Sequence, residues 1–126
     1  MAQTYDCICI DDDPLFLRKM EVYIHEVPWL RMMSTFTNPI QGATAVISNK
    51  PDIVFLDIEM PHVDGTYLAD WIEPKLAALD KRPKLVVLSS LSVAEEDRLA
   101  SVSGYLNKSE VDSPEELARQ LEIIMS

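Results

Sequence analysis

The chain has 126 residues, which is the length of a single domain. Its 11 basic and 21 acidic residues give a formal net charge of −10, the opposite sign from most nucleic-acid-binding domains. Its apolar stretches are far shorter than the roughly 20 residues that a membrane-spanning helix needs, and the first residues lack the basic start and apolar stretch of a signal peptide. We therefore expect no direct nucleic-acid binding by this segment and no membrane association.

The two cysteines of the chain, Cys7 and Cys9, stand two residues apart in the first apolar stretch. Residues at this spacing in a strand point to the same face of the sheet. This placement fits two buried thiols better than a disulfide, and unpaired thiols are typical of cytosolic proteins. The expected location is cytoplasmic.

Three continuous apolar tetrads, at 7–10, 53–56 and 85–88, show no polar alternation. Such runs are typical of strands buried on both faces, as in a parallel sheet covered by helices. More polar stretches at 32–36 and 104–107 are the two weaker strand candidates.

Helix start signals stand between these strands. Two Asx-Pro pairs combine an N-cap with proline at the first helical position, and two Ser-x-x-Glu capping boxes precede the last two helices. A further helix from Gly65 to about Leu79 contains Pro74, which should kink or split it. The four start signals are at Asp13, Asn38 (with Gln41 placed to close a capping box), Ser92 and Ser113.

Five strands and five helices thus alternate along the chain. This order predicts an α/β domain with a doubly wound, five-stranded parallel sheet and helices on both faces. The prediction is one domain over residues 1–126, with no effector domain within the chain.

The residues that follow the strands carry the candidate chemistry, because ligands of such sheets bind beyond the carboxyl ends of the strands. Carboxylates that converge there repel each other unless a multivalent cation is present, and hard oxygen ligands suit Mg²⁺. A metal ion, a hydroxyl and an ammonium match the oxygens of a phosphoryl group, with a carboxylate as nucleophile. The strand-end residues are Asp11-Asp12-Asp13, Asp57 with Glu59, Ser89-Ser90, and Lys108.

These motifs resemble those of the receiver domains of bacterial two-component response regulators, over essentially the whole chain. The similar residues are the acidic pair Asp11 and Asp12, the stretch 55–65 around Asp57, a hydroxyl at Ser89 and a lysine at Lys108. Asp-Ile-Glu-Met-Pro and Asp-Asp-Asp-Pro-Leu are most similar to the LytTR class. The resemblance implies a flavodoxin-like receiver fold and a role in signal transduction and transcription regulation.

For the metal site, the resemblance implies that Asp12 and Asp57 ligate Mg²⁺ together with the backbone carbonyl of Glu59, with Asp11 acting through water. For the reaction, it implies that Asp57 accepts a phosphoryl group from a phosphohistidine of a sensor histidine kinase. Lys108 would pair with that group.

For the switch, the resemblance implies that Ser89 follows the phosphoryl group and that Tyr105 is the aromatic switch residue. This change would act on an output face formed by the fourth helix, fifth strand and fifth helix, through which the protein could form a homodimer. The sequence also departs from the family pattern. Ser109 replaces the usual proline, so a cis bond is not expected there, and this departure concerns the scaffold. The segment from Ser89 to Lys108 is short, which concerns the output face, and Ser90 is a second candidate for the switch hydroxyl.

Two other functions compete with that of a phosphoacceptor coupled to an effector. A phosphatase of the haloacid-dehalogenase type also uses a strand-end aspartate with an acid two residues later, which Asp57 and Glu59 superficially match. A stand-alone receiver would act by protein–protein contact. We expect no enzyme activity beyond self-directed phosphotransfer and dephosphorylation.

Overall fold

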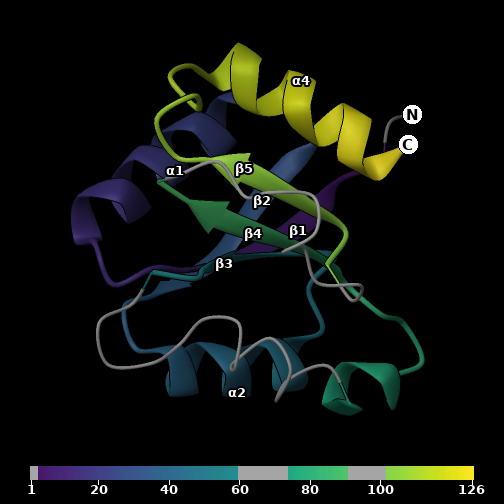
Figure 1. Ribbon diagram of the computed structural model, residues 1–126. Helices are drawn as coiled ribbons and strands as arrows, with labels where there is room; N and C mark the ends of the chain where they lie inside the picture. Colours follow the sequence, from purple (N-terminus) through teal and green to yellow (C-terminus); the bar gives the residue numbers. More distant parts are fainter. Residues whose placement is uncertain (1–2, 60–73, 91–101) are drawn as a thin grey trace.

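The computed structural model describes residues 3–59, 74–90 and 102–126, and their strands form one parallel sheet (Figure 1). The order of the strands across the sheet is β2-β1-β3-β4-β5, which confirms the predicted doubly wound topology. The strands are β1 (Tyr5–Ile10), β2 (Leu30–Phe36), β3 (Ile53–Asp57), β4 (Lys84–Ser89) and β5 (Gly104–Asn107).

Helices cover both faces of this sheet, as predicted. In Figure 1, α1 (Pro14–Glu26) and α4 (Pro114–Met125) lie on one side of the sheet and α2 (Pro39–Asn49) lies on the other. Residues 74–77 are also helical, at the end of the helix predicted from Gly65. The rest of that helix and the helix predicted from Ser92 fall outside the described residues. None of the described helices has the length and the apolar run that a membrane crossing requires.

The N-caps expected from the sequence are formed. Asp13 accepts the backbone N–H of Leu15 at 3.0 Å, and Ser113 accepts that of Glu116 at 3.1 Å. The Asn38 side chain accepts two backbone N–H groups at the start of α2. In each case a proline occupies the first helical position, where its missing N–H costs nothing. Each cap fixes where its helix begins, and the Asp13 cap starts α1 directly after the acidic run.

The central strands β1, β3 and β4 are largely buried, and alternate side chains enter two apolar clusters. From β1 and β3, the cluster beneath α1 and α4 receives Cys7, Cys9, Ile53 and Phe55. From the same strands, the cluster beneath α2 receives Ile8, Ile10, Val54 and Leu56. Both cysteines are buried free thiols, as the sequence predicted.

The edge strand β2 is longer than its sequence signal indicated, since 32–36 is the end of a seven-residue strand. One side of an edge strand is unpaired, and β2 is only partly buried, so it lacks the continuous apolar run of the central strands.

On the face of the sheet that α2 covers, Gly42 allows this helix to approach β1 closely. A Cβ at Gly42 would lie 2.6 Å from Cγ1 of Ile10.

Candidate functional site

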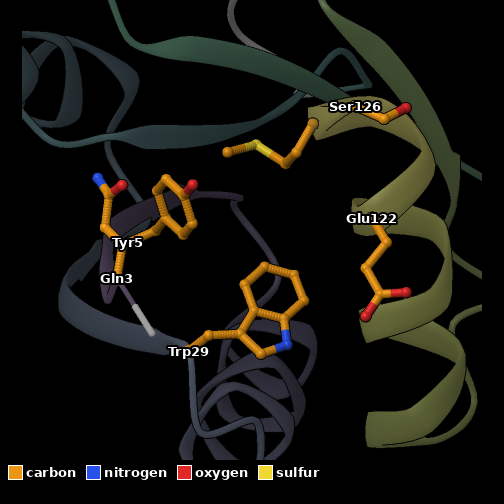
Figure 2. A pocket seen from close by; sticks show the side chains of 6 residues that line it. Gln3, Tyr5, Trp29, Glu122 and Ser126 are labelled. Carbon is orange, nitrogen blue, oxygen red and sulfur yellow. The ribbon is translucent and has the colours of Figure 1, made fainter. Parts of the chain in front are cut away.

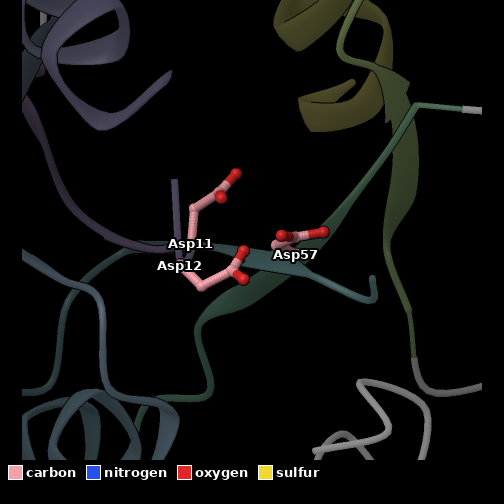
Figure 3. Close-up of side chains that lie close together, drawn as sticks. All are labelled: Asp11, Asp12 and Asp57. Atoms are coloured by element: carbon pink, nitrogen blue, oxygen red, sulfur yellow. The ribbon is translucent and has the colours of Figure 1, made fainter. Parts of the chain in front are cut away.

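The carboxyl ends of four strands place the predicted site residues at one edge of the sheet. Asp57 and Ser89 are the last residues of β3 and β4, whereas Asp11 and Lys108 directly follow β1 and β5. Figure 3 shows the side chains of Asp11, Asp12 and Asp57 directed toward a common space. A carboxylate oxygen of each lies within 4.8 Å of the others. The structure therefore brings these predicted residues together.

Lys108 joins the two buried carboxylates of this cluster. Its Nζ lies 2.7 Å from Oδ2 of Asp11 and 3.8 Å from Oδ2 of Asp57. Asp11 is fully buried and Asp57 is 1% exposed, so water screens this group of charges weakly. Burial disfavours the charged form of Lys108, but the close ion pair with Asp11 outweighs this and raises the pKa of the ammonium. Lys108 therefore stays protonated at neutral pH.

One ammonium does not neutralise two buried carboxylates. Burial, together with the neighbouring charge of Asp11, raises the pKa of Asp57 from 3.8 to about 7, although the backbone N–H of Glu59 donates to its Oδ1 at 2.8 Å. The site thus favours a second cation beside Lys108. Additional positive charge beside this carboxylate would favour its ionised form at neutral pH.

The donor set fits a hard divalent cation. All three side chains of the cluster offer carboxylate oxygens, and Asp12 is exposed to solvent, so a bound ion could keep water ligands. The carboxylate of Asp11 is oriented by the backbone N–H of Asp13, which donates to its Oδ1 at 2.9 Å. The cluster therefore fits the Mg²⁺ site that the resemblance to receiver domains implies. The ligand role of the Glu59 carbonyl remains a prediction.

Two features of the site were missed by the sequence analysis, and the first is Phe16. The Nζ of Lys108 lies 4.5 Å from the centroid of the Phe16 ring, within the range of a cation–π interaction. Phe16 is 7% exposed and stands in the first turn of α1. The available signal was its position: it is the first inward-facing residue of the helix that follows the acidic run.

The second feature is the side chain of Glu59, a residue to which the resemblance to receiver domains assigned only a backbone role. Its Oε1 accepts the hydroxyl of Ser89 at 2.8 Å and the backbone N–H of Ser90 at 3.0 Å, and its Oε2 accepts the hydroxyl of Ser90. Burial opposes the charge of this carboxylate, but the bonds from Ser90 and Ser89 lower its pKa. The signal in the sequence was a carboxylate and a pair of hydroxyls at adjacent strand ends.

The remaining predicted residues lie where the topology requires. Ser89 is 3% exposed and Ser90 is exposed, and the backbone N–H of Lys108 donates to the carbonyl of Ser89 at 2.8 Å. Tyr105 is half-buried in β5, opposite Val87 of β4. The peptide bond between Lys108 and Ser109 is trans.

A separate cavity of about 390 Å³ lies at the opposite edge of the sheet (Figure 2). Tyr5 and Trp29 form one wall, with ring centroids 6.2 Å apart in an edge-to-face arrangement. It lacks converging carboxylates. Tyr5 and Trp29 lie at the amino ends of β1 and β2, whereas the acidic cluster lies at the carboxyl ends of the strands. The lining residues are Gln3, Tyr5, Trp29, Glu122, Met125 and Ser126.

The topology defines a doubly wound α/β domain with an acidic site at the carboxyl edge of its sheet. The family model described as response regulator receiver domain matches residues 7–122, and the chain belongs to that family.

Two proteins with similar sequences are each less than 30% identical to this chain over the matched residues. The chain is 29% identical over 83 residues to the transcriptional regulatory protein BtsR of Escherichia coli K12, covering 66% of this chain and 33% of BtsR. It is 27% identical over 125 residues to a protein-glutamate methylesterase/protein-glutamine glutaminase of Methanosarcina acetivorans, covering 94% of this chain and 35% of that protein. The chain thus spans about a third of the length of these relatives.

Among solved structures, the complex of the P1 domain of CheA3 with CheY6 from R. sphaeroides matches with a TM-score of 0.73 and 27% identity. The match covers 98% of each chain. Receiver domains interact with histidine kinases, and they are in general not enzymes by themselves. The names of these three similar proteins give no support to the narrower similarity to the LytTR class.

Proposed function

We propose that this chain is a phosphorylation-dependent signalling domain that accepts a phosphoryl group on Asp57 from a phosphohistidine of a sensor histidine kinase. The observation that carries the proposal is the setting of Asp57. It is a buried carboxylate at a strand end, within reach of two further carboxylates and 3.8 Å from the Nζ of Lys108.

In the proposed reaction, an Oδ of Asp57 forms a bond to phosphorus while the phosphorus–nitrogen bond of the phosphohistidine breaks. The imidazole nitrogen keeps the electron pair. Lys108 pairs with an oxygen of the transferred group, and Ser89 donates a hydrogen bond to another. These contacts stabilise the charge that develops in the transition state, where preorganised donors contribute most.

Asp12 and Asp57 would hold Mg²⁺ directly, with the backbone carbonyl of Glu59 as a third ligand and Asp11 acting through water. The ion supplies positive charge that offsets the repulsion between the carboxylates and the incoming phosphoryl oxygens. Asp11, which is buried and paired with Lys108, fits a role behind the metal ligands better than Asp12, which is exposed.

The proposed output is a change at the face that includes β5 and α4. Ser89 would move toward the phosphoryl group, and the ring of Tyr105 would turn in response, altering contacts that could include a homodimer. The helix predicted from Ser92, which would complete this face, lies outside the described residues. We propose that the domain acts on a downstream effector, most simply a transcriptional one, and that it is located in the cytoplasm. Its two motifs similar to those of LytTR-class receivers favour an effector of the LytTR class.

The test is labelling with acetyl phosphate in the presence of Mg²⁺, read by intact mass. The wild type should gain one phosphoryl group, and Asp57→Asn should gain none. Asp13→Asn, which alters an exposed carboxylate two residues from Asp11, is the matched control and should still be labelled. Labelling of Asp57→Asn would contradict the site assignment. Sustained turnover of a phosphate ester would instead favour the phosphatase alternative.

A further inference from the structure

The carboxylate of Glu59 makes the contact on which this inference rests. It accepts the hydroxyl of Ser89, the hydroxyl of Ser90 and the backbone N–H of Ser90. Three donors therefore converge on one side chain, two residues after the phosphoacceptor. A carboxylate is a stronger acceptor than a neutral oxygen, because the negative charge strengthens each hydrogen bond.

We propose that Glu59 is a positioning residue that holds the Ser89 hydroxyl in the unphosphorylated protein and competes with the phosphoryl group of Asp57 for it. The inference rests on the proposed function and adds a residue that sets how readily the switch occurs. Its consequence is that the negative charge of Glu59 favours the resting state.

Hydrogen bonds from backbone N–H groups lie on both sides of this contact. The N–H of Glu59 donates to Oδ1 of Asp57 at 2.8 Å, and the N–H of Ile58 donates to the carbonyl of Leu88 at 3.2 Å. On the other side, the carbonyl of Ser89 accepts the N–H of Lys108 at 2.8 Å. These bonds place Glu59 and Ser89 beside the acceptor carboxylate and leave the rotation of side chains as the simplest change available.

The competition follows from the chemistry of a serine hydroxyl. It has one hydrogen to donate, so it cannot donate to Glu59 and to a phosphoryl oxygen at the same time. Because Ser89 is 3% exposed, loss of its bond to Glu59 is not readily replaced by a bond to water. Phosphorylation must therefore provide an acceptor good enough to replace a carboxylate.

Ser90 provides the internal comparison. Its hydroxyl donates to the other oxygen of the same carboxylate, but Ser90 is exposed and lies one residue beyond the strand end. Removing the Ser90 hydroxyl leaves the bond from Ser89 to Glu59 in place. Only the buried hydroxyl should therefore couple Glu59 to the acceptor site.

The experiment is a double-mutant cycle on the full chain, with the dissociation constant of beryllofluoride measured by titration at a fixed Mg²⁺ concentration. Glu59→Ala should tighten the binding of beryllofluoride by roughly 3- to 10-fold in the wild-type background. Ser89 would no longer have to give up its hydrogen bond to the Glu59 carboxylate, and the repulsion between that carboxylate and the anionic ligand would be gone. In the Ser89→Ala background the same change should give less than about half of that factor, because only the electrostatic part remains.

Two matched variants sharpen the cycle. Glu59→Gln keeps an acceptor for the hydroxyls but loses the charge, so its effect should be smaller than that of Glu59→Ala. Glu59→Gln can also replace Glu59→Ala in the cycle if the alanine variant does not fold. In the Ser90→Ala background, the effect of Glu59→Ala should match that in the wild type. Unfolding by urea, measured in parallel, separates changes in stability from changes in affinity.

The outcomes separate the two proposals. If the wild type does not bind beryllofluoride with Mg²⁺, the proposed function fails, and the competition by Glu59 fails with it. If the wild type binds, but Glu59→Ala has the same effect with and without the Ser89 hydroxyl, the competition alone is overturned. The competition is also overturned if the effect of Glu59→Ala on beryllofluoride binding disappears in the Ser90→Ala background but not in the Ser89→Ala background. The exposed hydroxyl of Ser90 would then be the one that couples to the acceptor site.

Discussion

Asp57→Asn should stabilise the metal-free protein at pH 8, because the native state forces two carboxylates, Asp11 and Asp57, into one buried site. The pKa of Asp57 is raised from 3.8 to about 7, mainly by burial. At 1.36 kcal/mol per pH unit, this rise corresponds to about 4 kcal/mol of cost for the charged form. This figure already includes the attraction of Lys108. Asparagine avoids the cost, but burying its own amide is also unfavourable, so we expect a net gain of about 1–3 kcal/mol.

The sign of the pH dependence follows from the direction of this shift. Between about pH 4 and 7, the native protein binds a proton at Asp57 more tightly than the unfolded chain does. The free energy of unfolding of the wild type should therefore fall as pH rises through this window. In Asp57→Asn this contribution is absent, so the difference in stability between the two proteins should grow with pH and level off above pH 7.

The assay is urea unfolding in EDTA at intervals from pH 5 to pH 8, with each variant measured beside the wild type. Asp12→Asn is the matched control, since Asp12 belongs to the same cluster but is exposed, and its effect should be smaller. Added Mg²⁺ should stabilise the wild type preferentially. A stability difference between wild type and Asp57→Asn that stays constant from pH 5 to pH 8 would refute the reasoning.

Three further changes have definite expected outcomes. Asp12→Asn should weaken Mg²⁺ binding by about tenfold or more, measured as the Mg²⁺-dependent rise in melting temperature, because it replaces one of three carboxylates with a neutral amide. Phe16→Leu should weaken beryllofluoride binding by roughly 2- to 5-fold, because Lys108 loses its contact with the ring. Gly42→Ala should lower the free energy of unfolding by about 1–3 kcal/mol, measured with urea, because the new Cβ would meet Ile10.

Each of these has a control on a neighbouring surface. Asp13→Asn should leave Mg²⁺ binding unchanged, and Leu15→Ala, at a position 80% exposed, should leave beryllofluoride binding unchanged. Thr44→Ala, on the exposed side of α2, should change stability by less than about 0.5 kcal/mol. Equal effects of a variant and its control would contradict the assigned contact.

The juxtaposition of Asp11, Asp57, Ser89 and Lys108 could be predicted because it depends only on topology. In a parallel sheet all carboxyl ends meet at one edge, so locating the strands locates the residues that follow them. The continuous apolar runs of the central strands made those strands easy to find. The partly buried edge strand β2 gave a weaker signal, and its start was predicted two residues late.

The contacts of Phe16 and Glu59 could not be predicted in the same way. They depend on which rotamer a side chain adopts and on the path of the loop that carries it, and neither follows from hydrophobic periodicity. The resemblance to receiver domains directed attention to the backbone of Glu59, whereas its side chain makes three of the hydrogen bonds beside the site.

The two thiols beneath α1 and α4 make the opening of this domain measurable without any added label. Burial raises the pKa of Cys7 to about 12 and also raises that of Cys9, so neither is a thiolate in the native state. An alkylating reagent reacts with the thiolate, and it can reach these sulfurs only when the cluster around them is exposed. The rate of alkylation under native conditions therefore reports the free energy of that opening. Cys9 lies two residues before Asp11, at the end of the strand that leads to the acidic run. If Mg²⁺ or beryllofluoride stabilises this region, the rate of Cys9 alkylation, followed by mass spectrometry, should decrease.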